Sequence, residues 1–316
     1  MATREKLTAA QDVLKQIIVG QDNCVELLFT SLLSGGHVLL ESVPGSGKTR
    51  FAKAFAKIIE GRFSRIQFTP DVLPSDVTGI QFFNPKTQNF ELRVGPVKAN
   101  VLLADEINRA TPRTQSSLLE VMEEHQTTID GETVRLPSPF FVIATQNPIE
   151  SNHGTFPLPE AQLDRFLMKI KLAYPSFEQE KEILLHQRES DSLNEIKPIF
   201  TTEEIVSLQQ EVRKILVSEV VTDYLLRIIH RTREHREIEL GASSRAALAL
   251  MRAGQALAFL RGREYVTPHD IKTLAASVLE HRLILSMDGA MRNEKVDVVR
   301  EIIESVEVPV ELELSR

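Results

Sequence analysis

Residues 42–49 read Ser-Val-Pro-Gly-Ser-Gly-Lys-Thr, a run that combines two glycines with a lysine and a hydroxyl side chain. The apolar segment 37–41 precedes this run and is bounded by turn signals, so we interpret it as a buried strand. Helical spacing resumes over 48–60. Gly45 and Gly47 would let backbone N–H groups curl around phosphate oxygens at the start of that helix. The pattern predicts a phosphate-binding loop.

Three side chains of this loop determine its chemistry. Lys48 would reach the β- and γ-phosphates of ATP, and Thr49 would offer its hydroxyl to Mg²⁺. Ser42 stands where the strict pattern has glycine, and a positive φ there would cost about 1 kcal/mol in strain. A chance Gly-Lys-Thr is the alternative, and the flanking strand and helix argue against it. We expect the loop to hold the nucleotide through Pro44, Gly45, Ser46, Gly47, Lys48, Thr49 and Arg50.

Two acids, Asp105 and Glu106, end the apolar run 101–104. Ligands of parallel sheets collect at the carboxyl ends of the strands, so both acids would face the phosphates. Asp105 would hold Mg²⁺ and its water shell together with Thr49, and Glu106 would orient and deprotonate the attacking water. Alternatively, the acids begin a loop and cap the helix near 112. The phosphate loop upstream favours the catalytic interpretation.

Another polar side chain, Asn147, follows the apolar run 140–145. Its amide could lie between the γ-phosphate and the attacking water. Alternatively, Asn147 only forms a turn before Pro148. Its position directly after a buried strand favours function.

Apolar runs alternate with helical patterns in the first part of the chain, which predicts a parallel sheet covered by helices on both faces. Segments 80–94 and 126–138 interrupt the alternation and are typical of hairpins. The runs are 37–41, 63–68, 100–104, 140–145 and 166–170, and helical patterns include 4–17, 22–33, 48–60 and 112–124.

From about residue 176 the pattern is helical only, and the loop 190–200 interrupts it once. We therefore predict an α/β nucleotide-binding domain over 1–188 and a smaller all-helical lid domain over 189–316. The helical patterns of this part are 176–189, 202–214, 219–236, 243–260 and 267–281.

The composition excludes several classes of protein. The 316 residues carry 37 basic and 44 acidic side chains, and this net charge of −7 argues against a nucleic-acid-coating protein. The single cysteine, Cys24, cannot form an intrachain disulfide, which suits a reducing compartment. The N-terminus has no secretory signal, and the apolar runs are too short to span a membrane. We expect a cytoplasmic protein.

Three stretches resemble the MoxR branch of the AAA+ ATPases. They run from Gly95 to Gln115, from Ala144 to Pro148 and from Leu158 to Phe166, and the similarity extends from Ile18 to Ala246. Lys98 and Arg236 depart from the family pattern, which usually has a large apolar residue and proline there. The resemblance implies a P-loop AAA+ fold that assembles into rings, usually hexamers, with ATP between neighbouring subunits.

The resemblance also implies roles for individual residues. Asn147 would be sensor 1, and Arg165 would be the arginine finger that reaches a neighbour's γ-phosphate. Arg245 would be sensor 2, on the lid over the nucleotide of its own subunit. Val19 and Gly20 would line the adenine pocket. A fixed guanidinium stabilises the charge of phosphoryl transfer, whereas the alternative for each arginine is a surface cation or ion pair.

The resemblance implies that hydrolysis remodels or matures a protein partner, possible roles being metal or cofactor insertion. A von Willebrand factor A-domain partner would be a separate chain, since this one ends at Arg316 without such a domain. Two alternatives stay open. One is a nucleic-acid motor, although Lys86, Arg93 and Arg135 in the hairpins form no dense basic or aromatic pattern. The other is a nucleotide-gated scaffold with little hydrolysis, which Ser42 makes conceivable.

Overall fold

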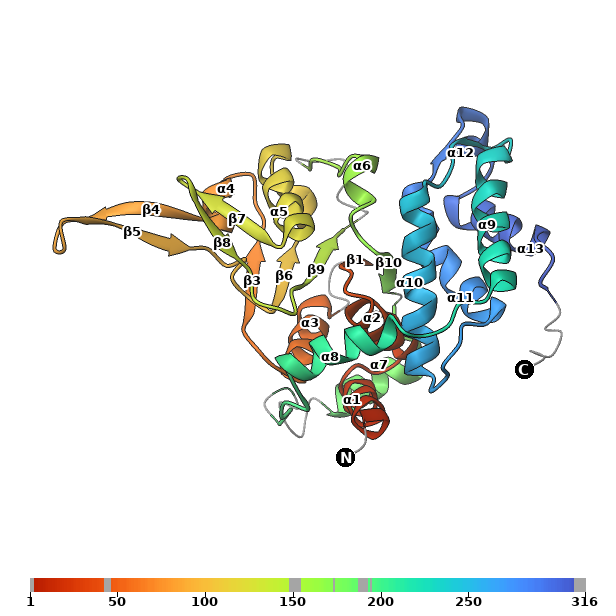
Figure 1. Ribbon diagram of the computed structural model, residues 1–316, viewed down its shortest axis with the longest axis horizontal. Coiled ribbons are helices and arrows are strands. Elements are labelled where there is room, and N and C mark those ends of the chain that lie inside the picture. The colour runs from red at the N-terminus through yellow and green to blue at the C-terminus, as the bar shows by residue number, and fades with distance from the viewer. Residues whose placement is uncertain are drawn as a thin grey trace.

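A five-stranded sheet forms the centre of the first part of the chain (Figure 1). The computed structural model describes residues 3–42, 47–147, 155–172, 174–186, 193 and 195–309. All neighbouring strands in the sheet are parallel, which confirms the predicted fold class. The strand order is β10 (Met168–Leu172), β1 (Val38–Ser42), β9 (Phe141–Gln146), β6 (Val101–Asp105) and β3 (Phe63–Gln67).

Helices cover both faces of this sheet because its strands are apolar on both sides. Alternate residues of a strand point to opposite faces. Val38 and Leu40 of β1 accordingly belong to one core cluster, and Leu39 belongs to the other. The first cluster includes residues of α1 (Thr3–Ile17), α2 (Asp22–Leu33) and α3 (Lys48–Lys57), and the second those of α5 (Pro112–Glu124).

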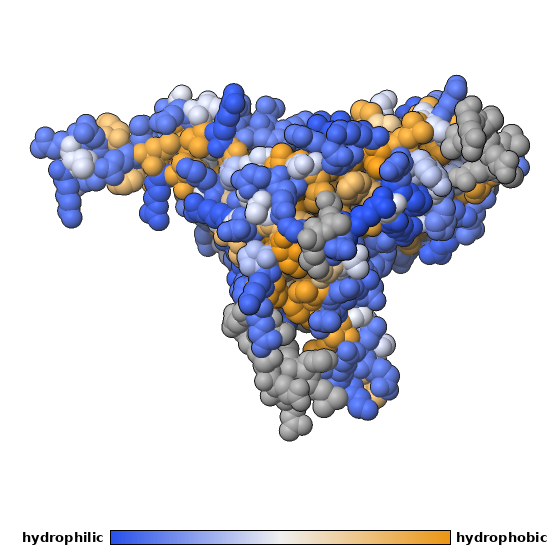
Figure 2. Space-filling view, turned by 60° about the horizontal axis from the view of Figure 1, so that its bottom comes forward, coloured by the Kyte–Doolittle hydropathy of each residue, from blue (hydrophilic) through white to orange (hydrophobic). Residues whose placement is uncertain are grey.

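Both predicted hairpins are confirmed. Strands β4 (Gly79–Asn84) and β5 (Asn89–Val94) pair antiparallel after the short helix α4 (Pro74–Thr78), and β7 (Gln126–Ile129) pairs with β8 (Glu132–Arg135). The β4–β5 hairpin projects from the body of the molecule in Figure 1. Figure 2 shows hydrophobic side chains along this arm, where the exposed residues include Ile80, Phe82, Phe83 and Phe90. The arm therefore presents aromatic surface far from the sheet.

The C-terminal part is helical apart from short strands that the sequence analysis did not predict. Strand β12 (Ile238–Leu240) pairs antiparallel with β13 (Ile284–Leu285), and β11 (Phe200–Thr201) pairs parallel with β2 (Ile59–Glu60). Such short strands are too brief to show alternation. The helices are α7 (Phe177–His186), α8 (Thr202–Val212), α9 (Glu219–Glu234), α10 (Ser244–Leu260), α11 (Pro268–Leu279), α12 (Met287–Arg292) and α13 (Lys295–Ser305).

The domain boundary near residue 188 stays a prediction. Two elements beyond it contact the first part of the chain, since β11 pairs with β2 and Gln209 of α8 donates a hydrogen bond to the carbonyl of Leu32. Helices α9 to α13 form a separate group beside β10 in Figure 1. None of the described helices is long and apolar enough to cross a membrane.

Arg282 joins this helical group to the sheet. It lies in the short helix η3 (Glu280–Arg282), its side chain is only 3% exposed, and its Nε donates to Oδ1 of Asp164 at 2.6 Å. Its other nitrogens donate to the carbonyls of Phe166 and Leu167. Burial disfavours the charged guanidinium and lowers its pKa, whereas Asp164 opposes that effect. Because a buried charge is costly without partners, this contact fixes the position of η3 against the start of β10.

His37, just before β1, ties the sheet to α5. Its Nε2 donates to the carbonyl of Met122, and its Nδ1 accepts the N–H of Val142. Burial lowers the pKa of His37 to about 4, so the ring is neutral at neutral pH. This neutral tautomer satisfies both contacts.

We predict that His37 makes the fold sensitive to acid. The unfolded chain protonates this ring below its ordinary pKa of about 6.5, and the folded chain only below about 4. The contribution to stability is therefore present above pH 6.5 and is lost as the pH falls toward 4, by about 3 kcal/mol. Urea unfolding at several pH values measures it. His37→Asn should show a shallower decline between pH 6.5 and 4, and equal slopes would contradict the prediction.

Candidate active site

The carboxylate of Asp105 is the centre of the polar groups at the carboxyl edge of the sheet. Its Oδ1 accepts a hydrogen bond from Thr145 Oγ1 at 2.7 Å, and its Oδ2 accepts one from Thr49 Oγ1 at 3.3 Å. Arg65 on β3 also donates to Oδ2, at 2.7 Å. Because β3, β6, β9 and β1 are parallel, their last residues converge here. The structure thus brings Thr49 and Asp105 together as the sequence predicted.

The ionisation state of the Asp105 carboxylate suits the binding of a cation. Burial would raise the pKa of Asp105, but hydrogen bonds from Thr145, Arg65 and Thr49 outweigh that effect and lower it. The group is therefore ionised at neutral pH. A carboxylate and a hydroxyl are the hard oxygen ligands that Mg²⁺ takes while keeping several waters. Thr49 and Asp105 therefore fit Mg²⁺, and at present Arg65 neutralises the carboxylate.

Glu106 adopts a left-handed backbone conformation with φ of 58°, and its N–H donates to Thr145 Oγ1 at 2.9 Å. Its carboxylate accepts a hydrogen bond from Gln67 Nε2 at 2.9 Å and pairs with Arg109 at 3.1 Å. The side chain is thus held toward β3. Gln67 and Arg109 thus hold the carboxylate of the expected base, Glu106, which directly follows Asp105.

The sequence analysis missed Arg65 and Gln67. Both lie on β3, two residues apart, and Gln67 is in register with Asp105. The sequence pattern of 63–68 predicts only a strand, although its alternate members Arg65 and Gln67 are polar. Polar residues on one face of a buried strand next to two acids were the available signal.

The phosphate loop itself lies mostly outside the described residues, which exclude Pro44, Gly45 and Ser46. Gly47 caps α3 with φ of 83°, a left-handed conformation that favours glycine. Lys48 begins α3, and its Nζ donates to the carbonyl of Ser42 at 3.3 Å. Thr49 and Arg50 follow on the first turn of α3.

The strain considered for Ser42 does not arise. Ser42 is the last residue of β1, pairs with Leu172 and does not have a positive φ. Serine adopts such a strand conformation without difficulty. The departure from glycine at this position therefore has no backbone cost.

The other predicted nucleotide-binding residues lie near the same edge or in the loop before α2. Asn147 directly follows β9 and is 2% exposed. Gly20 has φ of 77°, and a Cβ there would lie 2.4 Å from the side chain of Gln179 on α7. Gly20 thus lies against α7, and the role of Val19 and Gly20 at the adenine stays a prediction.

Arg165 and Arg245 lie at the opposite, amino edge of the sheet. Arg165 precedes β10, and its Nη1 pairs with Glu123 at 2.5 Å. Arg245, on the first turn of α10, pairs with Oε1 of the same Glu123 at 2.6 Å. Both line a cavity of about 290 Å³ together with His37, at the start of β1. About 13 Å of strand lies between Val38 and Ser42, the two ends of β1.

Arg245 therefore does not lie at the carboxyl edge with Thr49 and Asp105, and its role toward the nucleotide of its own subunit stays a prediction. Its partners Glu123 and Asp164 hold it beside Arg165 instead, with Asp164 Oδ2 at 3.8 Å. Helix α10 packs against α2, α9 and α11, and α11 packs against β10. Arg165 also forms an ion pair with an acid, Glu123, and its role as an arginine finger stays a prediction.

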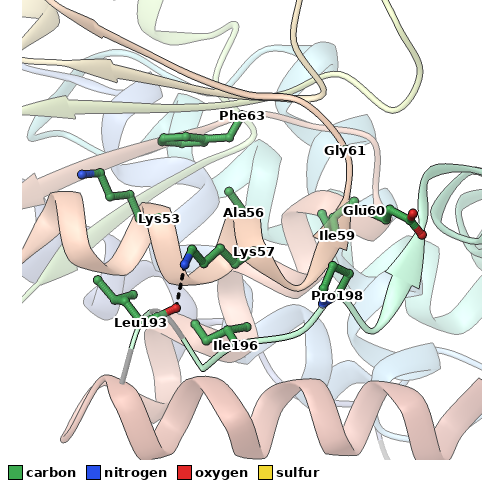
Figure 3. A pocket seen from close by; sticks show the side chains of 10 residues that line it. All are labelled: Lys53, Ala56, Lys57, Ile59, Glu60, Gly61, Phe63, Leu193, Ile196 and Pro198. Carbon is green, nitrogen blue, oxygen red and sulfur yellow. Dashed lines mark hydrogen bonds between the residues drawn. The ribbon is translucent and has the colours of Figure 1, made fainter. Parts of the chain in front are cut away.

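A second cavity, of about 600 Å³, lies between α3, β2 and the segment that precedes β11 (Figure 3). Its walls are mainly apolar, with Phe63, Ile196 and Pro198 among them. Lys57 Nζ donates to the carbonyl of Leu193 across it. The cavity is at the far end of α3 from Thr49, so it is separate from the site around Asp105.

Comparisons with known proteins agree with this architecture. Residues 37–168 match the ATPase family associated with various cellular activities (AAA), and residues 230–302 match the AAA lid domain. The uncharacterized protein YeaC of Bacillus subtilis is 47% identical over 306 residues, 96% of this chain and 95% of that protein. Chaperone MoxR1 of Mycobacterium tuberculosis is 44% identical over 305 residues, 93% of this chain and 80% of that protein. A solved structure from Cytophaga hutchinsonii shares 38% identity with a TM-score of 0.89, and the match covers 97% of this chain and 96% of that one.

We predict that Thr145→Val destabilises the fold. Thr145 is fully buried, and valine would leave Asp105 Oδ1 and the N–H of Glu106 without this partner. Unsatisfied buried groups of this kind cost about 2 kcal/mol in the free energy of unfolding. Urea denaturation measures the loss, and Thr128→Val on the exposed face of a hairpin is the matched control. Equal midpoints for the two variants would contradict the importance of this hydroxyl.

Proposed function

Because the chain belongs to the MoxR family of AAA+ ATPases, we propose that it hydrolyses ATP with Mg²⁺ between the subunits of a ring and remodels a protein partner. One observation carries the proposal. Ser42, Thr49 and Asp105 lie at the carboxyl edge of the sheet, whereas Arg165 and Arg245 lie at its amino edge. From this separation we infer that neither arginine completes the site of its own subunit.

A second copy of the chain supplies the missing cations in this proposal. Phosphoryl transfer spreads negative charge over the γ-phosphate oxygens, and a fixed guanidinium stabilises that charge. Arg165 and Arg245 of one subunit would contact the ATP bound to the next. Hydrolysis would then depend on assembly, which suits a ring that we propose to be hexameric.

The carboxyl edge supplies the remaining groups. Lys48 would bind the β- and γ-phosphates, and Asn147 would position the attacking water. Glu106 would accept the proton of that water once Gln67 and Arg109 release its carboxylate. A bound Mg²⁺ would neutralise phosphate charge next to Thr49 and Asp105. Val19 and Gly20 would contact the base.

A protein client is supported by two observations. One relative is named Chaperone MoxR1, and the β4–β5 hairpin exposes Phe82, Phe83 and Phe90. We propose that this ATPase acts in the cytoplasm on a client or with a von Willebrand factor A-domain partner, for example in metal or cofactor insertion. The hairpins offer only scattered cations for nucleic acid, and the extended backbone of Ser42 removes the reason for a scaffold without hydrolysis.

We predict that Glu106→Gln binds ATP normally and loses phosphate release. The amide keeps the shape of the side chain but cannot accept the proton, so turnover should fall about 10²-fold or more. Calorimetric titration with ATP and Mg²⁺ measures binding, and released phosphate measures turnover. Glu304→Gln, an exposed position on α13, is the charge-matched control. A parallel loss of binding and turnover would remove Glu106 from the role of base.

We predict that Arg165→Ala also binds ATP without hydrolysing it. Mixing it with Glu106→Gln should restore activity, because sites between an intact Glu106 and a neighbour's intact Arg165 then form. Phosphate release over a range of mixing ratios measures the effect. Wild-type turnover should also rise more than proportionally with protein concentration as subunits assemble. Absence of rescue in rings shown by native mass spectrometry to be mixed would count against an arginine acting across subunits.

A further inference from the structure

We propose that Glu123 is a positioning residue that aligns Arg165 and Arg245 as one unit for the ATP bound to the neighbouring subunit. The inference rests on the proposed function of the two arginines and adds the group that sets their geometry. Glu123 lies in the last turn of α5, Arg165 lies between α6 (Glu160–Leu163) and β10, and Arg245 lies in the first turn of α10. Three separate elements therefore meet at one carboxylate.

The two oxygens of Glu123 are divided between the two arginines. Oε2 contacts Arg165 Nη1 at 2.5 Å, and Oε1 contacts Arg245 Nη2 at 2.6 Å. Arg165 Nη1 also donates to the carbonyl of Leu119, one turn earlier on α5. These contacts leave Nε and Nη2 of Arg165 and Nε of Arg245 available within the described part of the chain. The Nη1 of Arg245 lies 3.8 Å from Asp164, so both guanidiniums are held on one side and keep donors for a partner on the other.

The supports of this carboxylate are fixed. His37 holds the carbonyl of Met122, the residue before Glu123, and the ring is buried and neutral. Arg282 holds Asp164, the residue before Arg165, through a contact of 2.6 Å. A site needs such backing, because a misplacement of about 1 Å costs roughly 10²-fold in rate.

Electrostatics explain why an acid lies between the arginines. Two guanidiniums held close together repel each other, and the attraction of each to one shared carboxylate offsets that repulsion. The surrounding cavity has four arginines, Arg165, Arg245, Arg252 and Arg282, against Glu123 and Asp164. The cavity therefore keeps a net positive charge that suits a polyphosphate.

A purely stabilising role does not fit the exposure of the cluster. The side chains of Glu123, Arg165 and Arg245 are 37%, 31% and 53% exposed. Ion pairs this exposed contribute little to the free energy of unfolding. The contact instead limits the rotamers of two long side chains and joins the lid helix α10 to α5.

The test is Glu123→Gln, with Glu124→Gln as the control. Glu124 is the next residue on α5, is exposed and carries the same charge. E123Q should lose about 10²-fold in kcat, the cost of misplaced catalytic groups, and keep the ATP affinity and melting temperature of E124Q. Turnover by E123Q equal to or above that of wild type would overturn the proposal, since Glu123 would then be idle or inhibitory.

Mixed rings distinguish positioning from a general structural defect. E123Q subunits mixed with E106Q subunits should regain turnover, because E106Q subunits supply aligned arginines to intact sites of E123Q subunits. The E106Q/E123Q double variant should not rescue E123Q. Rescue of E123Q by the double variant would overturn the role of Glu123. So would a failure of E106Q to rescue E123Q in rings shown to be mixed.

The R165A and E106Q mixture separates this result from failure of the proposed function. If R165A is rescued by E106Q but E123Q is not, only the assignment of Glu123 is wrong. If neither variant is rescued, the proposed site shared between subunits is wrong. Should E123Q melt well below E124Q, Glu123→Asp carries the same comparison. It keeps the charge and shortens the reach, and wild-type turnover by E123D would overturn the proposal.

Discussion

The parallel direction of the five strands is the constraint on which the rest of the structure depends. Because all strands run the same way, Ser42, Asp105 and Asn147 meet at one edge of the sheet, and His37 and Arg165 meet at the other. Antiparallel strands would mix these groups. The fold thus separates the groups that fit phosphate and Mg²⁺ from the arginines, and our proposal that sites form between subunits follows from that separation.

Polar contacts at each edge of the sheet determine the orientation of the side chains there. At the carboxyl edge, Thr145 bonds both Asp105 and the backbone of Glu106, so the two acids are oriented by one buried hydroxyl. Arg65 and Gln67 on the outer strand hold the two carboxylates. The strand that precedes α4 and the β4–β5 hairpin therefore contacts both acids, which offers a physical route from the hairpin to the site.

Local patterns predicted the sheet, both hairpins and the pairing of Thr49 with Asp105, because these depend on spacing and strand ends. They could not predict features that depend on how distant segments pack. The position of Arg245 follows from how the C-terminal helices dock against the sheet, where Arg282 of η3 contacts Asp164, 118 residues earlier in the chain. Conversely, serine in place of the motif's glycine at position 42 suggested backbone strain, yet Ser42 has a strand conformation without such strain. Strands β12 and β13 are too short to produce alternation.

The lid and the arginines are joined through the same few residues. Asp164 contacts Arg282 of η3 and lies 3.8 Å from Arg245 of α10, while Glu123 bridges Arg245 to Arg165. A rotation of the lid relative to the sheet would therefore move Arg245 against Glu123, and through that carboxylate it would disturb Arg165. Because exposed ion pairs are weak, such a change would cost little energy. In a ring, the position of one subunit's lid would then set the alignment of cations at the next subunit's ATP.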